Sequence, residues 1–168
     1  MNPVLARRSI RRFTDRPLEE TDLQALLAAA LAAPSAHHQS PAHFLVSTDR
    51  GRLDRIPQFH SYASMMRSAA AAVLVCGVPP FKDLDFLPQD LAAATENLLV
   101  EATARGLGSC WLGVYPKAPL MEACRLWGDL PEEVLPFALV ALGWPGETKT
   151  PHPDRPDPAR IRRETWGA

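Results

Sequence analysis

An unbroken apolar run lies near the middle of the chain, Ala71-Ala72-Val73-Leu74-Val75-Cys76-Gly77-Val78, and Pro79-Pro80 follows it. A short run without polar alternation, bounded by proline, is typical of a strand that is buried on both faces. A strand of this kind needs helices on both sides of its sheet. The stretch therefore predicts a central strand in a sheet that lies between two layers of helices.

Further strands and helices are expected on both sides of this run. Apolar segments at 42–47, 109–114 and 134–143 are predicted to be strands. The spacing of leucine and alanine predicts helices at 18–33 and 88–105. The order of these elements indicates an α+β fold with one sheet flanked by helices, although periodicity alone leaves a doubly wound fold open.

The length and charge of the chain limit the kind of protein it can be. Its 168 residues, 46% of them hydrophobic, suit a single domain with a substantial core. The formal net charge of −1 gives no global attraction to nucleic acid or to an anionic membrane. No apolar run reaches about 18 residues, and no secretory signal opens the sequence. We therefore expect a cytoplasmic protein with no nucleic-acid or membrane partner.

The cysteines and histidines do not form a metal-binding pattern. The three cysteines lie in apolar surroundings without CxxC spacing, at Cys76, Cys110 and Cys124. They are expected to be reduced, buried thiols. Four histidines share no spacing with a carboxylate or a thiol, at His37, His38, His43 and His60. No metal site is therefore expected.

A basic stretch near the N-terminus is the first candidate binding site, Arg7-Arg8-Ser9-Ile10-Arg11-Arg12-Phe13. Guanidinium groups can hold a phosphate through paired hydrogen bonds, and a serine hydroxyl can donate another. An ordinary solvated basic face has the same composition. From these residues alone, both an anion site and a solvated surface stay open.

A second candidate is the loop 34–41, Pro34-Ser35-Ala36-His37-His38-Gln39-Ser40-Pro41. Its two end prolines enclose a dense set of hydroxyl, imidazole and amide groups. Such a set between an apolar helix and a strand favours a loop that faces a ligand.

Two later stretches complete an order of motifs, Gly106-Leu107-Gly108-Ser109-Cys110-Trp111-Leu112-Gly113 and Ala141-Leu142-Gly143-Trp144-Pro145. With the basic stretch and the loop before them, they resemble the nitroreductase family of flavin mononucleotide (FMN) enzymes, nearly end to end. The resemblance implies a single, mainly antiparallel sheet flanked by helices, in an intertwined homodimer that holds FMN between its subunits. The chain, 1–168, would be one nitroreductase-like FMN-binding domain, with 145–168 as an extended C-terminal arm.

The resemblance also implies cofactor-binding roles for particular residues. Contacts to the phosphate, ribityl and pyrimidine side of FMN fall on Arg7, Arg8, Ser9 and Arg11. The amides that would face the hydride-accepting nitrogen of the flavin fall on Leu112, Gly113 and Val114. A basic residue of the tail is expected to return to the FMN phosphate, with Arg155 the first choice and Lys149 the second.

The family's loop motif falls on 34–41 and would come from the other subunit. Its FMN contacts are expected at Pro34, Ser35, Ala36, His38 and Ser40. Here the chain departs from the family pattern, because His38 stands where asparagine is usual and Ser40 where glutamine is usual. Both side chains can still hydrogen-bond the flavin edge. The paired histidine also resembles the nitroreductase-type domain of enzymes that mature a deazaflavin coenzyme.

The activity that the resemblance implies is an oxidoreductase in which FMN carries the electron chemistry and no side chain is a catalytic nucleophile. NADH or NADPH would donate hydride, and a small acceptor such as a nitroaromatic or a quinone would then be reduced in a ping-pong cycle. Three alternatives stay open. They are a non-catalytic FMN protein for storage or sensing, a specialised flavin enzyme of coenzyme-maturation, dehalogenase or desaturase type, and a small phosphate-ligand or nucleic-acid binder built on the arginines.

Overall fold

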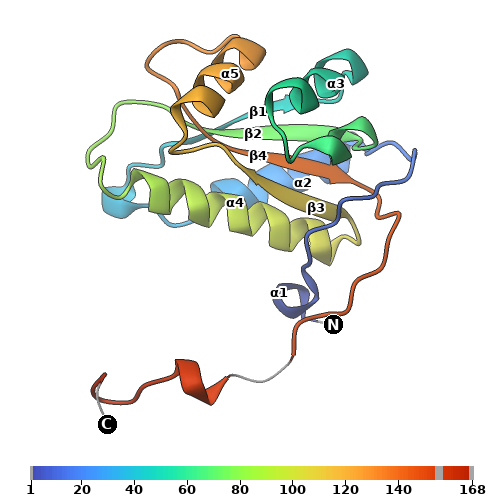
Figure 1. The fold of residues 1–168 in the computed structure, drawn as a ribbon. Coiled ribbons are helices and arrows are strands. Elements are labelled where there is room, and N and C mark those ends of the chain that lie inside the picture. The colour runs from blue at the N-terminus through green and yellow to red at the C-terminus, as the bar shows by residue number, and fades with distance from the viewer. Residues whose placement is uncertain (1, 154–156, 167–168) are drawn as a thin grey trace.

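The computed structural model describes residues 2–153 and 157–166 (Figure 1). The α-helices are α1 (Pro3–Ala6), α2 (Glu20–Leu31), α3 (Arg50–Phe59), α4 (Leu87–Ala104) and α5 (Ala118–Gly128). The strands are β1 (Ala42–Ser47), β2 (Ala71–Gly77), β3 (Gly108–Gly113) and β4 (Leu135–Gly143). Short 3-10 helices are η1 (Ala36–His38), η2 (Ser64–Arg67) and η3 (Pro158–Arg160).

The described strands form one sheet in the order β1-β2-β4-β3 (Figure 1). Each neighbouring pair runs antiparallel. A doubly wound fold has a mostly parallel sheet, so this topology rules that alternative out. The α+β fold with a single antiparallel sheet flanked by helices is confirmed, and the predicted central strand is β2.

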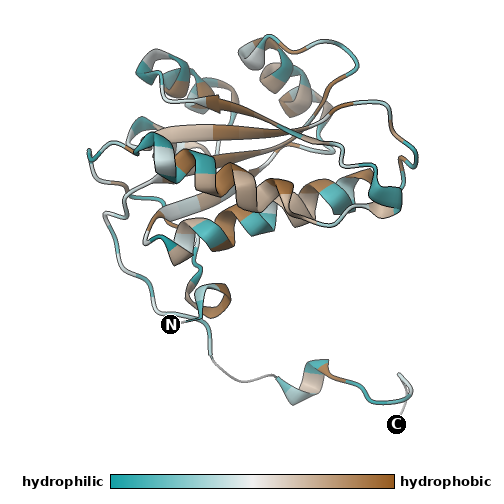
Figure 2. Cartoon of the chain, turned by 180° about the vertical axis from the view of Figure 1, so that it is seen from behind, coloured by the Kyte–Doolittle hydropathy of each residue, from teal (hydrophilic) through white to brown (hydrophobic). Residues whose placement is uncertain are grey.

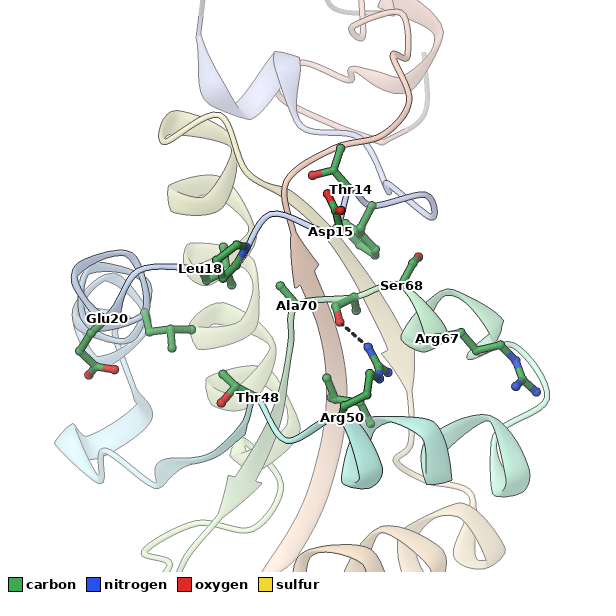
Figure 3. A pocket seen from close by; sticks show the side chains of 14 residues that line it. Thr14, Asp15, Leu18, Glu20, Thr48, Arg50, Arg67, Ser68 and Ala70 are labelled. Carbon is green, nitrogen blue, oxygen red and sulfur yellow. Dashed lines mark hydrogen bonds between the residues drawn. The ribbon is translucent and has the colours of Figure 1, made fainter.

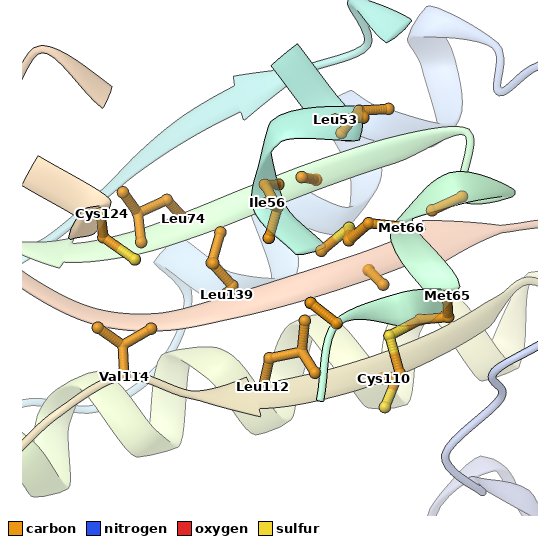
Figure 4. Packing of buried hydrophobic residues seen from close by; sticks show 14 of the residues in the cluster. Leu53, Ile56, Met65, Met66, Leu74, Cys110, Leu112, Val114, Cys124 and Leu139 are labelled. Carbon is orange, nitrogen blue, oxygen red and sulfur yellow. The ribbon is translucent and has the colours of Figure 1, made fainter. Parts of the chain in front are cut away.

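The sheet separates two apolar cores, because successive side chains of a strand point to opposite faces. In β2, Leu74 and Cys76 belong to the core under α3 and α5, whereas Val73 and Val75 belong to the core under α2 and α4. Figure 4 shows the first core, where side chains from α3, η2 and α5 meet those of the sheet. All of β2 is buried. The expectation of a strand covered on both faces is therefore confirmed.

The long helix α4 packs beside α2 on the second face of the sheet, in front of α2 in Figure 1 and behind it in Figure 2. The two helices are also joined by a hydrogen bond, in which Asn97 Nδ2 donates to the Ala29 carbonyl at 3.1 Å. In Figure 2, α4 carries both hydrophobic and hydrophilic residues along its length. Among the described residues, no helix combines the length and apolar character needed to cross a membrane.

Pro136 is the second residue of β4, an interior strand between β2 and β3. Proline has no N–H to donate to a strand ladder, so interior strands accept it only where the ladder is irregular. The pairing of β2 with β4 shifts register between Val75 and Cys76, and Cys76 lies opposite Pro136. The proline therefore sits at an existing irregularity near the strand entry.

The N-terminal basic stretch runs along the outer edge of β3. Ser9 forms a parallel bridge with Ser109, and Phe13 forms an antiparallel bridge with Pro145, just beyond β4. The Ile10 N–H donates to the Ser109 carbonyl at 2.9 Å. We call this pairing of residues 9–14 with Ser109 and residues 144–147 the N-terminal seam.

A carboxylate closes the N-terminal seam. Glu147 Oε1 accepts hydrogen bonds from the backbone N–H groups of Arg11 and Arg12, at 2.5 and 3.2 Å. The Arg11 hydrogen bond, and secondly the charge of Lys149, hold the pKa of Glu147 below its usual range. The group is therefore ionised at neutral pH, which keeps both backbone donors satisfied.

The C-terminal segment leaves the body of the protein after the seam. The His152 N–H donates to the Leu5 carbonyl at 2.9 Å, which ties the segment to α1. Beyond the undescribed residues, 157–166 are exposed throughout and lie away from the sheet in Figures 1 and 2. They include Trp166, which is 87% exposed. The extended C-terminal arm over 145–168 stays a prediction, since part of it lies outside the described residues.

We expect Gly108→Ala to lower the free energy of unfolding by about 1–3 kcal/mol, the usual cost of overpacking a core. A Cβ at Gly108 would meet Ile10 Cγ2 at 2.9 Å and Phe13 Cε1 at 3.2 Å. Both neighbours are buried residues of the seam. Urea unfolding followed by tryptophan fluorescence measures the change.

Gly113→Ala, in the same strand, is the matched control. A Cβ at Gly113 would have no atom within 4 Å. The substitution should change the free energy of unfolding by no more than about 0.5 kcal/mol, as is usual for surface positions. Equal losses for the two variants would contradict the tight packing of the seam against β3.

Candidate functional site

A cavity of about 540 Å³ opens beside the edge strand β3, and we call it the β3 cavity. It is lined by the N-terminal stretch, the segment after α3, η2, β3 and the start of α5. The lining residues are Arg11, His60, Ser61, Tyr62, Ser64, Met65, Cys110, Trp111, Leu112, Gly113, Tyr115, Lys117 and Leu120. Its volume falls within the range of about 300–1,000 Å³ that is usual for cofactor sites.

The backbone of β3 presents polar groups to this edge. The Ser109 carbonyl accepts from Ile10, and the Gly113 carbonyl accepts from His60 Nε2 at 3.0 Å, so both point away from β4. In a strand, the N–H of a residue points to the same side as its carbonyl. The Gly113 N–H is therefore directed to the outer edge of β3. Because nothing lies within 4 Å of a Cβ built on Gly113, a flat ligand can approach this backbone closely.

His60 is hydrogen-bonded to the last residue of β3. Its side chain is 3% exposed, and it forms its hydrogen bond with Gly113 through Nε2. This contact requires the proton on Nε2, because a carbonyl can only accept. In the described structure, the buried Nδ1 atom has no hydrogen-bond partner. His60 therefore helps to hold the backbone of Gly113, a residue that lines the β3 cavity.

The four N-terminal arginines do not act as one cluster. The Arg7 guanidinium forms an ion pair with Glu96 of α4 at 3.2 Å, and Arg8 donates to the Thr150 carbonyl. Arg11 lines the β3 cavity, and the side chain of Arg12 is exposed elsewhere. The pairing of residues 9–14 fixes the backbone in this region, so the arginine side chains lie in different places.

The tail residue Arg155 lies outside the described residues. The alternative, Lys149, lies 3.6 Å from Glu147 Oε1 at the seam. Lys149 also lines a shallow cavity of about 250 Å³ with Arg8. The structure therefore brings two basic residues together near the seam, on a different cavity from Arg11.

Loop 34–41 has an unusual backbone. His37, His38 and Ser40 have φ values of 52°, 51° and 44°, in a region that residues other than glycine rarely occupy. The Ser35 hydroxyl accepts from the Ser40 N–H at 2.9 Å and closes the loop. Strain of this kind persists only where the surroundings hold the backbone in place.

Asp90 provides that restraint. It lies in the first turn of α4 and is 7% exposed. Its two carboxylate oxygens accept from the Ala36 N–H at 2.9 Å and from Gln39 Nε2 at 2.6 Å. The Gln39 carbonyl oxygen in turn accepts from the backbone of Lys82 and Asp83. The loop is therefore anchored to α4 and to the segment before it.

A larger cavity, of about 790 Å³, lies at the start of β2 (Figure 3). It contains cations and carboxylates in equal number, with Arg50 and Arg67 beside Asp15 and Glu20. Arg50 is already engaged, since it donates to the Ala69 carbonyl at 2.9 Å and forms an ion pair with Asp54. None of the predicted cofactor-binding residues that the structure describes lines this cavity.

Comparison with known proteins identifies the family. The sequence model of the nitroreductase family matches residues 4–78 and 54–144. The chain belongs to the nitroreductase family. An Archaeoglobus fulgidus protein, provisionally named NADH dehydrogenase/NAD(P)H nitroreductase, is 40% identical over 167 residues, which are 97% of this chain and 96% of the relative.

Solved structures of nitroreductase folds match over almost the whole chain. A provisionally named NADH oxidase of Clostridium acetobutylicum has a TM-score of 0.93 and 33% identity, covering 98% of this chain and 99% of its own. A provisionally named nitroreductase of Desulfovibrio desulfuricans, solved in complex with FMN, has a TM-score of 0.82 and 29% identity, covering 98% and 96%.

Apart from the arginines discussed above, the described site residues predicted for this nitroreductase-family chain fall in two separate places. Arg11, Leu112 and Gly113 line the β3 cavity together, whereas Val114 is fully buried in the core. The predicted loop residues lie elsewhere. Pro34, Ser35 and Ser40 line a separate cleft of about 30 Å³, Ala36 is bonded to Asp90, and His38 is exposed.

Several lining residues were not predicted. Ser61, Ser64, Tyr115, Lys117 and Leu120 were not singled out, although the last three follow the glycine-rich stretch closely in sequence. Tyr62 and Met65 also line the cavity.

We expect Asp90→Ala to lower the free energy of unfolding by about 1–3 kcal/mol, because two donors lose their acceptor in a buried site. Amide hydrogen exchange of residues 35–40 should accelerate, since the restraint on the strained loop is lost. Asp85→Ala is the matched control, because Asp85 is exposed and its substitution removes one negative charge close to the same loop. An unchanged exchange rate in Asp90→Ala would contradict the anchoring role.

We expect the three thiols to be unreactive toward Ellman's reagent in the native protein at pH 8. Burial raises the pKa of Cys76 and of Cys124 to about 12, and it also raises the pKa of Cys110. The reactive thiolate is therefore disfavoured at this pH. In guanidinium chloride all three should react, and rapid native labelling of Cys76 or Cys124 would contradict their burial.

Proposed function

We propose that this nitroreductase-family chain is an FMN-dependent oxidoreductase that takes hydride from NADH or NADPH and reduces nitroaromatics, quinones or similar acceptors. One observation carries the proposal. The N-terminal seam brings the Arg11 side chain to the same cavity as the accessible backbone of Leu112 and Gly113. The family match and the FMN complex of the Desulfovibrio desulfuricans relative support the choice of cofactor.

The residues of the β3 cavity fit the needs of a flavin. An isoalloxazine ring needs a flat surface, and the glycine at the end of β3 leaves its backbone accessible. The outward Gly113 N–H is suited to donate to a ring nitrogen. Reduced flavin carries negative charge, which the Arg11 cation would stabilise. Ser61 and Ser64 add hydroxyl groups for the ring edge.

The phosphate of FMN would lie toward the seam. Arg7, Arg8 and Ser9 are the proposed contacts at this end, and Arg155 or Lys149 would complete them from the tail. Arg8 and Lys149 already line one cavity together, which supports this arrangement. Since Arg7 pairs with exposed Glu96, its guanidinium would exchange that partner, or share it, when phosphate binds.

We also propose that the site is completed in a homodimer by loop 34–41 of the partner subunit, through Pro34, Ser35, Ala36, His38 and Ser40. Within one chain, this loop and the β3 cavity line separate spaces. The exposed segment 157–166, with Trp166 at 87% exposure, offers apolar surface that a second subunit would cover. The single domain thus supplies both halves of a shared site.

FMN, when bound, supplies the chemistry of accepting a hydride and passing two electrons to the acceptor. In the overall reaction, one NAD(P)H and one proton convert a quinone to a hydroquinone. A nitro group is converted to a nitroso group with release of water. The ping-pong order follows if donor and acceptor use the same face of the β3 cavity in turn, with Gly113 and Arg11 fixing the ring between the two steps.

The visible spectrum of the purified protein tests the proposal. After FMN addition and desalting, the protein should remain yellow, lose its absorbance with NADH or NADPH under anaerobic conditions, and regain it when a quinone is added. Retained flavin that is never reduced would favour a non-catalytic FMN protein instead. Loss of all flavin on desalting would refute the FMN assignment.

We expect Arg11→Gln to weaken FMN binding roughly tenfold or more, the scale of one charge-assisted hydrogen bond. Quenching of flavin fluorescence on titration of the apoprotein measures the dissociation constant. Arg12→Gln is the matched control, because the neighbouring side chain is exposed and does not line the cavity. Equal weakening in both variants would indicate a general charge effect and contradict the role of Arg11.

A further inference from the structure

We propose that Lys117 makes this protein select aromatic acceptors that carry a carboxylate. The proposal rests on the oxidoreductase function above and specifies its substrate class. Lys117 directly precedes α5 and lines the β3 cavity together with Arg11 of the N-terminal stretch. It would form an ion pair with the anionic group of an acceptor whose ring lies in the cavity.

The lining of the β3 cavity is positively charged. It contains the cations Arg11 and Lys117 and no aspartate or glutamate. This contrasts with the larger cavity of Figure 3, where Asp15 and Glu20 balance Arg50 and Arg67. The chain as a whole has a net charge of −1, so the excess of cations is local to the β3 cavity. A cavity of one sign concentrates ligands of the opposite sign.

Lys117 is available to bind such a ligand. Among the described residues, no carboxylate lies within the 4.0 Å ion-pair distance of its ammonium group, whereas Arg7, Arg105 and Lys149 are all paired. Its backbone is fixed, because the Lys117 N–H donates to the Val114 carbonyl at 3.0 Å. The first turn of α5 carries no acidic residue, so the positive end of the helix adds to the same field.

The two cations have separate tasks. Arg11 comes from the seam and is assigned to the flavin, whereas Lys117 comes from the segment between β3 and α5. An anion on the flavin itself would be met by the basic residues of the seam. The remaining cation, Lys117, is therefore left for the second ligand of the cavity.

The β3 cavity has an aromatic wall, to which Tyr62, Trp111 and Tyr115 contribute. The Trp111 ring lies 5.9 Å from that of Phe137, and the Tyr115 ring lies 6.0 Å from the same Phe137 ring. These contacts hold Trp111 and Tyr115 in place, and both residues line the cavity. Tyr62 stands at the mouth and is 76% exposed. A planar ring with an attached carboxylate matches both the aromatic wall and the cation.

The phosphates of NAD(P)H are the other source of an anion at this cavity. They would meet Lys117 in the half-reaction with the donor, whereas a carboxylate would meet it in the half-reaction with the acceptor. The two half-reactions can be measured apart in a ping-pong cycle, so the source of the anion can be identified.

The test compares 4-nitrobenzoate with its neutral analogue 4-nitrobenzamide in the wild-type holoenzyme and its variants. Each turnover consumes one NADH and one proton, converts the nitro group to a nitroso group, and releases NAD⁺ and water. The quantity measured is the ratio of kcat/KM for the anionic acceptor to that for the neutral one. Because intrinsic reactivity cancels between variants, a change in this ratio reports on charge recognition.

We expect the ratio to fall roughly threefold to fivefold in Lys117→Gln, the size of a solvent-accessible ion pair. It should fall further in Lys117→Glu and should be retained in Lys117→Arg. The wild-type preference should also weaken as salt is added. Arg55→Gln is the matched control, because Arg55 is exposed on α3 and does not line the cavity, so its ratio should equal that of the wild type.

A binding measurement gives a second readout without turnover. Benzoate, which cannot be reduced, should bind the oxidised holoenzyme more tightly than benzamide by calorimetry, and Lys117→Gln should remove that difference. An unchanged acceptor ratio in Lys117→Glu, in a protein that turns over both acceptors, would overturn the proposal while leaving the oxidoreductase function intact. A change confined to flavin reduction by NADH or NADPH would also overturn it, since the anion would then belong to the donor. A protein that retains no flavin would refute both proposals.

Discussion

Residues 9–14 are hydrogen-bonded to both β3 and the segment after β4, and the candidate site depends on this N-terminal seam. The bond between Ile10 and Ser109 sets the register of the basic stretch against the sheet. With that register fixed, Arg11 falls on the β3 cavity, while Arg7 and Arg8 are directed to α4 and to the C-terminal segment. If the pairing of this stretch shifted by one residue, Arg12 instead of Arg11 could face the β3 cavity, because successive residues of an extended chain face opposite sides.

The sheet determines where a site can lie. Both of its faces are filled by apolar cores, so neither face is left for a ligand. The outer edge of β3 is different, because in the described part of the chain its backbone groups have no neighbouring strand beyond the short bridge at Ser109. Gly113 leaves that edge accessible, and His60 holds the carbonyl beneath it. A backbone held in this way is suited to orient a cofactor that carries the chemistry itself.

Local sequence patterns predicted the framework better than the site. The run 71–78 reveals a doubly covered strand, because burial on both faces removes polar residues from the sequence itself. The backbone of His37, His38 and Ser40 could not be foreseen, since these residues disfavour positive φ and are held there by the distant Asp90. The order of the motifs pointed to the candidate site residues, but only the structure shows that they line separate cavities. Lys117 was missed because its significance lies in the absence of carboxylates around the cavity, which no single stretch of sequence displays.

The seam also bears on the order in which the molecule is completed. Ser9 pairs with Ser109, and Phe13 pairs with Pro145, so the earliest part of the chain is joined to one of the last. Contacts between residues so distant in sequence form late in folding, because the intervening loop must first be closed. During synthesis, the arginine stretch would emerge from the ribosome long before its partners. A nascent chain therefore cannot complete the N-terminal seam, which holds Arg11 at the β3 cavity, until residues 144–147 have been made.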